Sequence, residues 1–190
     1  MWVVALPLVM LACNAEEKEN QKEEQVEETS GVKEVQTKEE RQEEIAKMEG
    51  EIAGLVRGER TEMLDAKADR LLKRYRDYIS VNPRDSITAE YLFKAADLSV
   101  GVGRYEAAIN YLDRLNNEFP KFRKNVEMWL FKGFIYETYL NDHASAVNTY
   151  QELVKRYPNH RLAQDARASI ENLSMSEEEL IEKFEKMNEK

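Results

Sequence analysis

The chain has 190 residues, of which 42% are hydrophobic and 34% are charged, with only seven glycines and four prolines. This composition favours helices, and no segment alternates apolar and polar residues in the way that predicts a half-buried strand. The net charge of −9 argues against a nucleic-acid partner, because binding phosphates requires a basic face.

The first segment, residues 1–12, is an apolar run broken only by Pro7. It is too short to span a bilayer, which takes about 20 apolar residues, but it fits the apolar core of a secretory signal peptide.

The run ends in the letters MLAC at residues 10–13, which resemble the lipobox of bacterial lipoproteins. The resemblance implies cleavage before Cys13, acylation of that cysteine and a lipid anchor in the cell envelope. In some bacteria an aspartate after this cysteine retains the lipoprotein in the inner membrane; Asn14 stands there instead, so the resemblance favours the outer membrane. The alternative is that Cys13 is an ordinary small apolar residue.

Residues 14–38 consist almost entirely of Glu, Lys, Gln, Asn, Ser and Thr, and only four of them are apolar. Such a segment cannot bury enough surface to offset its conformational entropy. The sequence therefore predicts that residues 13–38, with an acylated Cys13 at their start, form a disordered acidic tether. The tether would hold a folded domain, expected over residues 39–189, away from the membrane. A solvated tail without a specific task is the alternative.

Beyond residue 39 the apolar residues follow the helical period, and three prolines divide the chain. Pro83, Pro120 and Pro158 are 37 and 38 residues apart, and each closes a segment with matching apolar positions upstream. A fixed period near forty residues indicates stacked helix pairs. The apolar stripes of the eight expected helices cover residues 45–56, 64–78, 89–96, 105–115, 129–136, 146–153, 162–173 and 180–184. The sequence therefore predicts an all-α solenoid of about four helix hairpins.

The middle of the chain resembles the tetratricopeptide repeat, which places large and small residues at fixed positions of two paired helices. The matching residues are Leu92, Ala96, Gly103, Tyr105, Ala108, Leu112 and Pro120, followed by Trp129, Gly133, Tyr136, Ala146, Tyr150 and Pro158. In such repeats small residues let the paired helices approach closely, while larger ones fill the space between neighbouring pairs. Gly133 and Ala146 are 13 residues apart, one more than the corresponding residues of the second hairpin, so one extra residue is expected in the third.

The repeats, the lipobox and the tether together resemble the BamD/YfiO group of outer-membrane assembly lipoproteins, with the repeat resemblance covering residues 89–173. Such motifs also occur in the periplasmic cell-division coordinator of the Tol–Pal system, which places a coiled coil before its repeats. The resemblance implies a protein-interaction scaffold in outer-membrane protein assembly. The alternative is a self-associating structural or cell-division-coordinating protein, for which residues 38–56 would form a coiled-coil seam.

Motifs that indicate catalysis are absent from the sequence, which contains no HExxH, GxSxG, P-loop or CxxC pattern. Cys13 is the only cysteine and allows neither an intrachain disulfide nor a thiolate metal cluster. The two histidines, His143 and His160, fall at expected helix starts, where exposed polar rings are typical. We therefore expect a protein that is not an enzyme, holds no cofactor or metal, and binds protein or peptide partners.

In the tetratricopeptide family the first helix of each pair lines the concave surface, and this implies a set of partner-binding residues. They are Glu90, Phe93 and Asp97 on the third expected helix, and Glu127, Leu130, Phe134 and Glu137 on the fifth. Because these side chains mix apolar and acidic groups, we expect a peptide or helix with apolar anchors and Lys or Arg beside them. The alternative is that Phe93 and Phe134 only pack between helix pairs.

Overall fold

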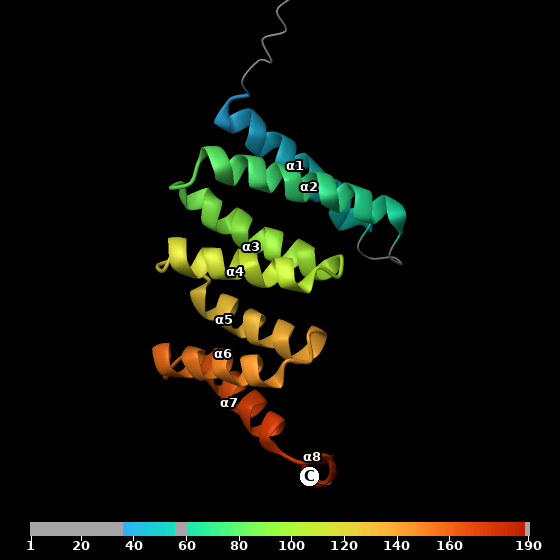
Figure 1. Cartoon of the computed structure of the whole chain (residues 1–190), viewed down its shortest axis with the longest axis vertical. Helices are drawn as coiled ribbons and strands as arrows, with labels where there is room; N and C mark the ends of the chain where they lie inside the picture. Colours follow the sequence, from blue (N-terminus) through green and yellow to red (C-terminus); the bar gives the residue numbers. More distant parts are fainter. Residues whose placement is uncertain (1–35, 56–60, 189–190) are drawn as a thin grey trace, which may run out of the picture. The chain divides into compact units, whose positions relative to one another are not determined.

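Helices are the only regular elements in residues 36–55 and 61–188, which are the parts of the chain that this computed structural model describes (Figure 1). In chain order they are α1 (Lys38–Leu55), α2 (Glu62–Val81), α3 (Ser86–Gly101), α4 (Tyr105–Glu118), α5 (Asn125–Phe134), the π-helical η1 (Ile135–Tyr139), α6 (His143–Arg156), α7 (Arg161–Ser174) and α8 (Glu177–Asn188). The predicted all-α class is confirmed. The predicted signal peptide, Cys13 and all but the last three residues of the predicted tether lie outside the described residues.

The helices stack in chain order, each one packed against the next from α1 to α7 (Figure 1). Three hairpins are formed by α1 with α2, by α3 with α4, and by α5 and η1 with α6, while α7 packs against the last of them. The predicted solenoid of helix hairpins is confirmed. α8 is attached more loosely, because none of its side chains that the structure describes is buried. It is held to α7 by hydrogen bonds from Lys183 to Glu171 and Asn172, both at 2.9 Å.

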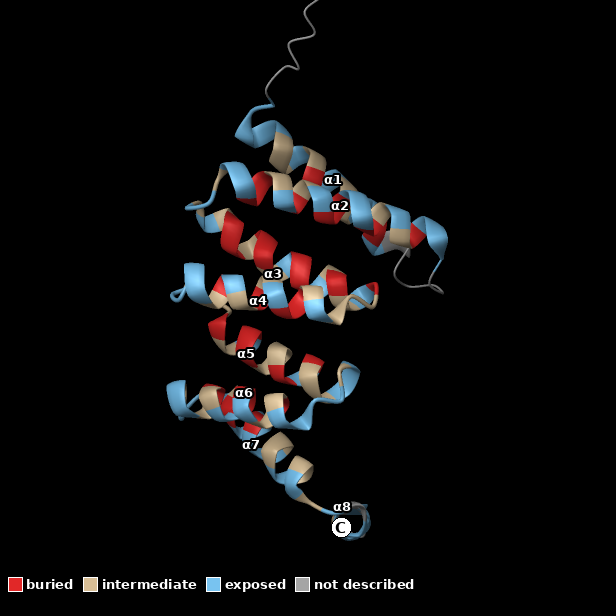
Figure 2. Ribbon diagram, in the orientation of Figure 1, coloured by how far each residue is buried: buried red, intermediate tan, exposed pale blue. Residues whose placement is uncertain are grey.

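The core lies between the helices from α1 to α7, whose buried residues are mostly apolar (Figure 2). Three of the predicted small residues, Ala96, Ala108 and Ala146, are completely buried. Gly133 shows why such a position must be small. A Cβ atom there would lie 2.6 Å from Cδ1 and 2.8 Å from Cζ of the Tyr150 ring, which is closer than side chains approach.

The third hairpin contains one turn that is not regular α-helix. In η1 the Leu140 N–H donates to the Ile135 carbonyl, five residues back, at 3.1 Å. Asn141 then adopts the left-handed conformation, with φ at 51°, before α6 begins. The connection 140–142 is as long as the connection 102–104 of the second hairpin. The extra residue that the sequence predicts is therefore wound into the helix as a π-turn, and the loop is not lengthened.

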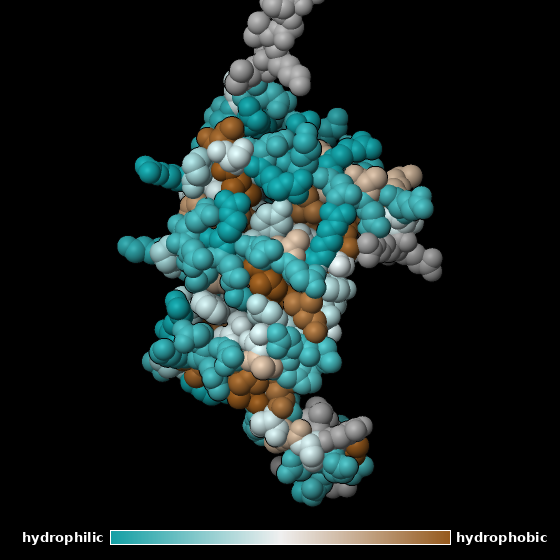
Figure 3. All heavy atoms as spheres, in the orientation of Figure 1, coloured by the Kyte–Doolittle hydropathy of each residue, from teal (hydrophilic) through white to brown (hydrophobic). Residues whose placement is uncertain are grey.

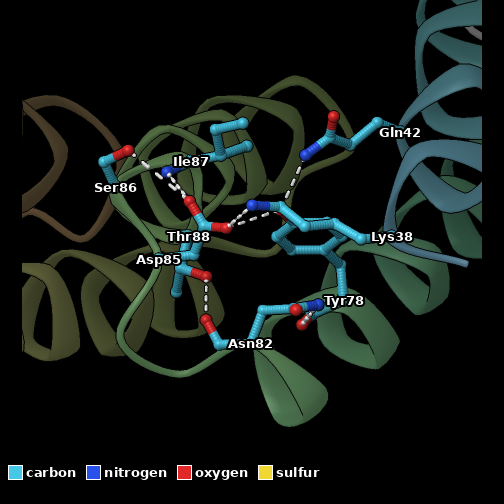
Figure 4. Close-up of polar contacts among 8 residues, drawn as sticks. All are labelled: Lys38, Gln42, Tyr78, Asn82, Asp85, Ser86, Ile87 and Thr88. Atoms are coloured by element: carbon cyan, nitrogen blue, oxygen red, sulfur yellow. Dashed lines mark hydrogen bonds and ion pairs between the residues drawn. The ribbon is translucent and has the colours of Figure 1, made fainter.

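The first and second hairpins are joined by polar contacts around the buried Tyr78 (Figure 4). Its hydroxyl accepts from Gln42 Nε2 at 2.8 Å and donates to Asp85 Oδ2 at 3.2 Å. Asp85 also caps α3 by accepting from the Ile87 N–H at 2.9 Å, and it pairs with Lys38. The hydrogen bonds from Lys38 and from the Ile87 N–H hold the pKa of Asp85 below its usual value. This network ties α1, α2 and α3 together.

The apolar face of α1 is covered within the chain. Ile45 and Ile52, which a coiled coil would place in its intermolecular seam, are buried in the core. Glu49 on the same helix accepts a hydrogen bond from Tyr75 Oη of α2 at 2.7 Å. Because α2 already packs against this face, the coiled-coil seam considered for residues 38–56 is not available on α1.

Candidate protein-binding surface

The four candidate residues on α5 and η1 lie together in one groove. The groove has a volume of about 610 Å³ and runs between α5, η1, α6 and α7. We call it the α5–α7 groove. Its lining residues are Glu127, Leu130, Phe131, Phe134, Glu137, Tyr150, Leu162, Asp165 and Ser169. The face of the molecule drawn in Figure 3 is mostly hydrophilic, with separate apolar patches.

Phe134 is the most exposed apolar ring of this groove. Its side chain is 42% exposed, although it carries no polar group. The ring lies edge-on against Tyr139 at 5.6 Å, and Tyr139 in turn stacks on Tyr105 at 4.5 Å. These contacts hold the Phe134 ring from one side and leave the other open, so it can serve as an anchor point without losing much side-chain entropy.

The charges of the α5–α7 groove all have one sign. Its lining includes the carboxylates of Glu127, Glu137 and Asp165 and no basic side chain. Glu137 accepts a hydrogen bond from Tyr150 Oη at 2.7 Å, which fixes the carboxylate in the groove. Burial, together with this hydrogen bond, raises the pKa of Tyr150, so the hydroxyl stays protonated and continues to donate. The groove therefore offers negative charge beside apolar surface.

Two of the three candidates on α3 are covered by the connection between α4 and α5. Glu90 pairs with Arg123 at 2.6 Å and with Lys124 at 3.4 Å, so its charge is already balanced. The Phe93 ring lies 6.1 Å from the rings of both Phe122 and Phe131. Phe93 therefore packs between the second and third hairpins, as the packing alternative expects.

Asp97, the third candidate on α3, lies in a second groove of about 580 Å³ between the first hairpin and α3. Partial burial against apolar neighbours raises the pKa of its carboxyl. Lys94, which lines the same groove, is bonded to Glu49 at 2.7 Å and does not pair with Asp97. The seven candidates therefore do not form one surface. Four line the α5–α7 groove, Asp97 lines the second groove, and Glu90 and Phe93 are covered.

Sequence reasoning missed the contribution of α7 to the α5–α7 groove. Leu162, Asp165 and Ser169 line it from α7, at the spacing of one helix face. The signal was present, because α7 is the first helix of the fourth predicted pair and the family rule for concave positions applies to it. Tyr150 could not be found in that way, since it reaches the groove from the second helix of a pair.

Residues 132–160 match a family model described as a tetratricopeptide repeat. The match supports a protein of the tetratricopeptide-repeat type. It covers the end of α5, η1 and α6, which carry Phe134, Glu137 and Tyr150 of the groove. Repeats of this type bind protein partners and are typically non-catalytic interaction modules. A search of curated protein sequences gives no match to the chain.

No helix in residues 36–55 and 61–188 combines the length and apolar character needed to cross a bilayer. Nor do these ranges bring together three side chains able to ligate a metal ion. His143 and His160 are both exposed, and His160 Nδ1 caps α7 by accepting from the Leu162 N–H at 3.2 Å.

Proposed function

We propose that the chain is a non-enzymatic interaction scaffold whose α5–α7 groove binds a peptide or helix with an apolar anchor beside Lys or Arg. The observation that carries the proposal is the exposed Phe134 ring in a groove lined by three carboxylates and no basic side chain. Of these carboxylates, Asp165 has an ion pair with Arg161 at 3.9 Å, whereas Glu127 and Glu137 have none with a described residue. An apolar side chain of the partner would cover Phe134 and Leu130. Its cations would pair with Glu127, Glu137 and Asp165.

We further propose that this scaffold works in the cell envelope, held at the outer membrane by lipid on Cys13. The lipobox-like residues 10–13 and the acidic segment that follows support this placement. Two or three acyl chains anchor a protein stably, whereas one chain is marginal. An envelope scaffold with repeats of this kind fits a role in outer-membrane protein assembly, in line with the BamD/YfiO resemblance.

The proposed binding site is tested by replacing Phe134 and comparing how much partner protein is recovered from crosslinked native envelopes. Phe134→Ala should lower recovery of the partner by about tenfold or more, because an exposed aromatic anchor at an interface contributes about 2 kcal/mol. Phe93→Ala is the matched control, since the partly buried Phe93 packs between the second and third hairpins. The control should change stability, measured by denaturant unfolding, and leave the affinity of the folded protein unchanged. Equal recovery with Phe134→Ala and wild type would rule out the groove.

The identity of the captured proteins tests the cellular role separately. Barrel-assembly components of the outer membrane are the expected partners. Recovery of Tol–Pal or division proteins would contradict the assembly role and favour a coordinating role in division, while leaving the groove itself intact.

A further inference from the structure

We propose that copies of this chain associate head to tail, with α8 of one copy lying in the groove between α1 and α2 of the next. The contact uses neither Phe134 nor the α5–α7 groove, so it stands independently of the function proposed above.

The receiving surface is a basic groove in a chain of net charge −9. It has a volume of about 420 Å³, and we call it the α1–α2 groove. Its lining residues are Glu44, Lys47, Met48, Glu51, Ile52, Lys67, Arg70, Lys73 and Arg74. Five cations and two carboxylates give this groove a net charge of +3, which is opposite in sign to the chain as a whole.

Both carboxylates of the α1–α2 groove are already used. Glu51 pairs with Lys67 at 2.6 Å and Glu44 pairs with Arg74 at 2.7 Å. The other three cations, Lys47, Arg70 and Lys73, form no ion pair with any described residue. Like charges one turn apart on a helix repel each other, so Arg70 and Lys73 would gain from an added anion.

The groove also contains apolar surface. Met48 in its lining is only partly buried, whereas Ile52 is buried. Cations around an apolar strip fit an amphipathic acidic helix better than a phosphate or a flat lipid surface, because only the helix supplies an apolar side chain for the strip.

α8 carries a complementary face that nothing in the described structure covers. Glu178, Ile181, Glu182 and Glu185 follow the spacing i, i+3, i+4, i+7 of one helix face. Ile181 is 53% exposed. Glu182 pairs with Lys186 on its own helix, whereas Glu178 and Glu185 form no ion pair with a described residue. The helix thus presents an apolar side chain between two unpaired carboxylates.

The two surfaces also match in the order of their groups. Ile181 lies between Glu178 and Glu185 on α8, and the groove holds the apolar Met48 with unpaired cations on both walls, Lys47 on α1 and Arg70 and Lys73 on α2. With Ile181 over Met48, one carboxylate would face Lys47 and the other would face Arg70 and Lys73.

The partner is a second copy because the two surfaces lie at opposite ends of the stack. In Figure 1, α1 and α2 form one end of the helical unit, and α8 follows α7 at the other. A contact of this kind is heterologous, since each copy keeps one free groove and one free α8. It therefore continues into chains of copies unless a ring closes.

Sedimentation of the full chain in a non-ionic detergent tests the contact, with three designed sets of variants. The double variant Arg70→Glu, Lys73→Glu reverses the charge of these two groove positions. The double variant Glu178→Lys, Glu185→Lys reverses the charge of the two unpaired positions on α8. Each pair alone should weaken association by about tenfold or more. An equimolar mixture of the two variants should associate again, because each provides the partner for the other. Arg76→Glu with Glu106→Lys, outside both surfaces, is the matched control and should behave as wild type.

Circular dichroism of every variant should retain the helical signal, so that a loss of association is not a loss of folding. The proposal is overturned if the wild-type chain stays monomeric at the highest concentration, or if the mixture of reversed variants fails to associate. Binding of the wild-type chain to vesicles of anionic phospholipid, without self-association, would also overturn it and assign the α1–α2 groove to a lipid surface.

Discussion

At the scale of single residues, the close contact of Gly133 with Tyr150 fixes the third hairpin. The Tyr150 ring lies against Gly133 of α5, and its hydroxyl donates a hydrogen bond to Glu137 in the groove. One glycine therefore serves both the packing of the hairpin and the position of a groove carboxylate. A larger residue would have to move a ring that is almost completely buried.

Overpacking a full core forces side chains and backbone to shift, which costs about 1–3 kcal/mol. Because the gain in helix propensity of about 1 kcal/mol offsets part of this cost, we expect Gly133→Ala to destabilise the chain by up to about 2 kcal/mol. Gly50→Ala is the control, since a Cβ at Gly50 meets no atom within 4 Å and should stabilise α1 by about 0.5–1 kcal/mol. Denaturant unfolding measures both, and an unchanged or higher stability of Gly133→Ala would contradict the packing argument.

At the scale of elements, the sequence predicted the features that follow from residue spacing, which are the helices and their crossings. It did not predict the contacts made by the connections between helices. The helices and the small residues of their crossings follow from periodicity and from the proline spacing, and they are present. The covering of Glu90 by Arg123 could not be predicted, because it depends on the path of a connection that has no period. The extra residue of the third hairpin was predicted, but its place in η1 depends on which backbone hydrogen bonds are kept.

We expect deletion of Thr138, an exposed residue of η1, to convert the π-turn into regular α-helix and to leave the fold intact. Residues up to Glu137 would keep their register, and α6 would keep its loop. Gln151 is an exposed residue within α6, which is regular α-helix and contains no extra residue. Deleting Gln151 should therefore shift Leu153 out of the core. Thermal unfolding should show a far larger loss for the Gln151 deletion, and equal losses would mean that η1 holds no spare residue.

At the scale of the whole molecule, we interpret the chain as a stack of hairpins presented at a membrane by its amino-terminal segment. In the proposed function the anchor is lipid on Cys13. Cys13→Ser should therefore release the protein from the detergent-soluble membrane fraction and abolish labelling by radioactive fatty acid, with no change in helical content. Retention of the Cys13→Ser protein in the membrane fraction would show that lipid on this residue is not the anchor.

The central claim, that the α5–α7 groove receives a protein partner, is tested most directly by a photo-crosslinking amino acid at position 134 of the full chain in its native envelope. We predict that the captured peptide carries an apolar residue beside Lys or Arg, and that Asp165→Lys reduces the capture. The same probe at Met63, which is 62% exposed on α2, is the control. Capture of the same partner with equal yield at both positions would contradict the account.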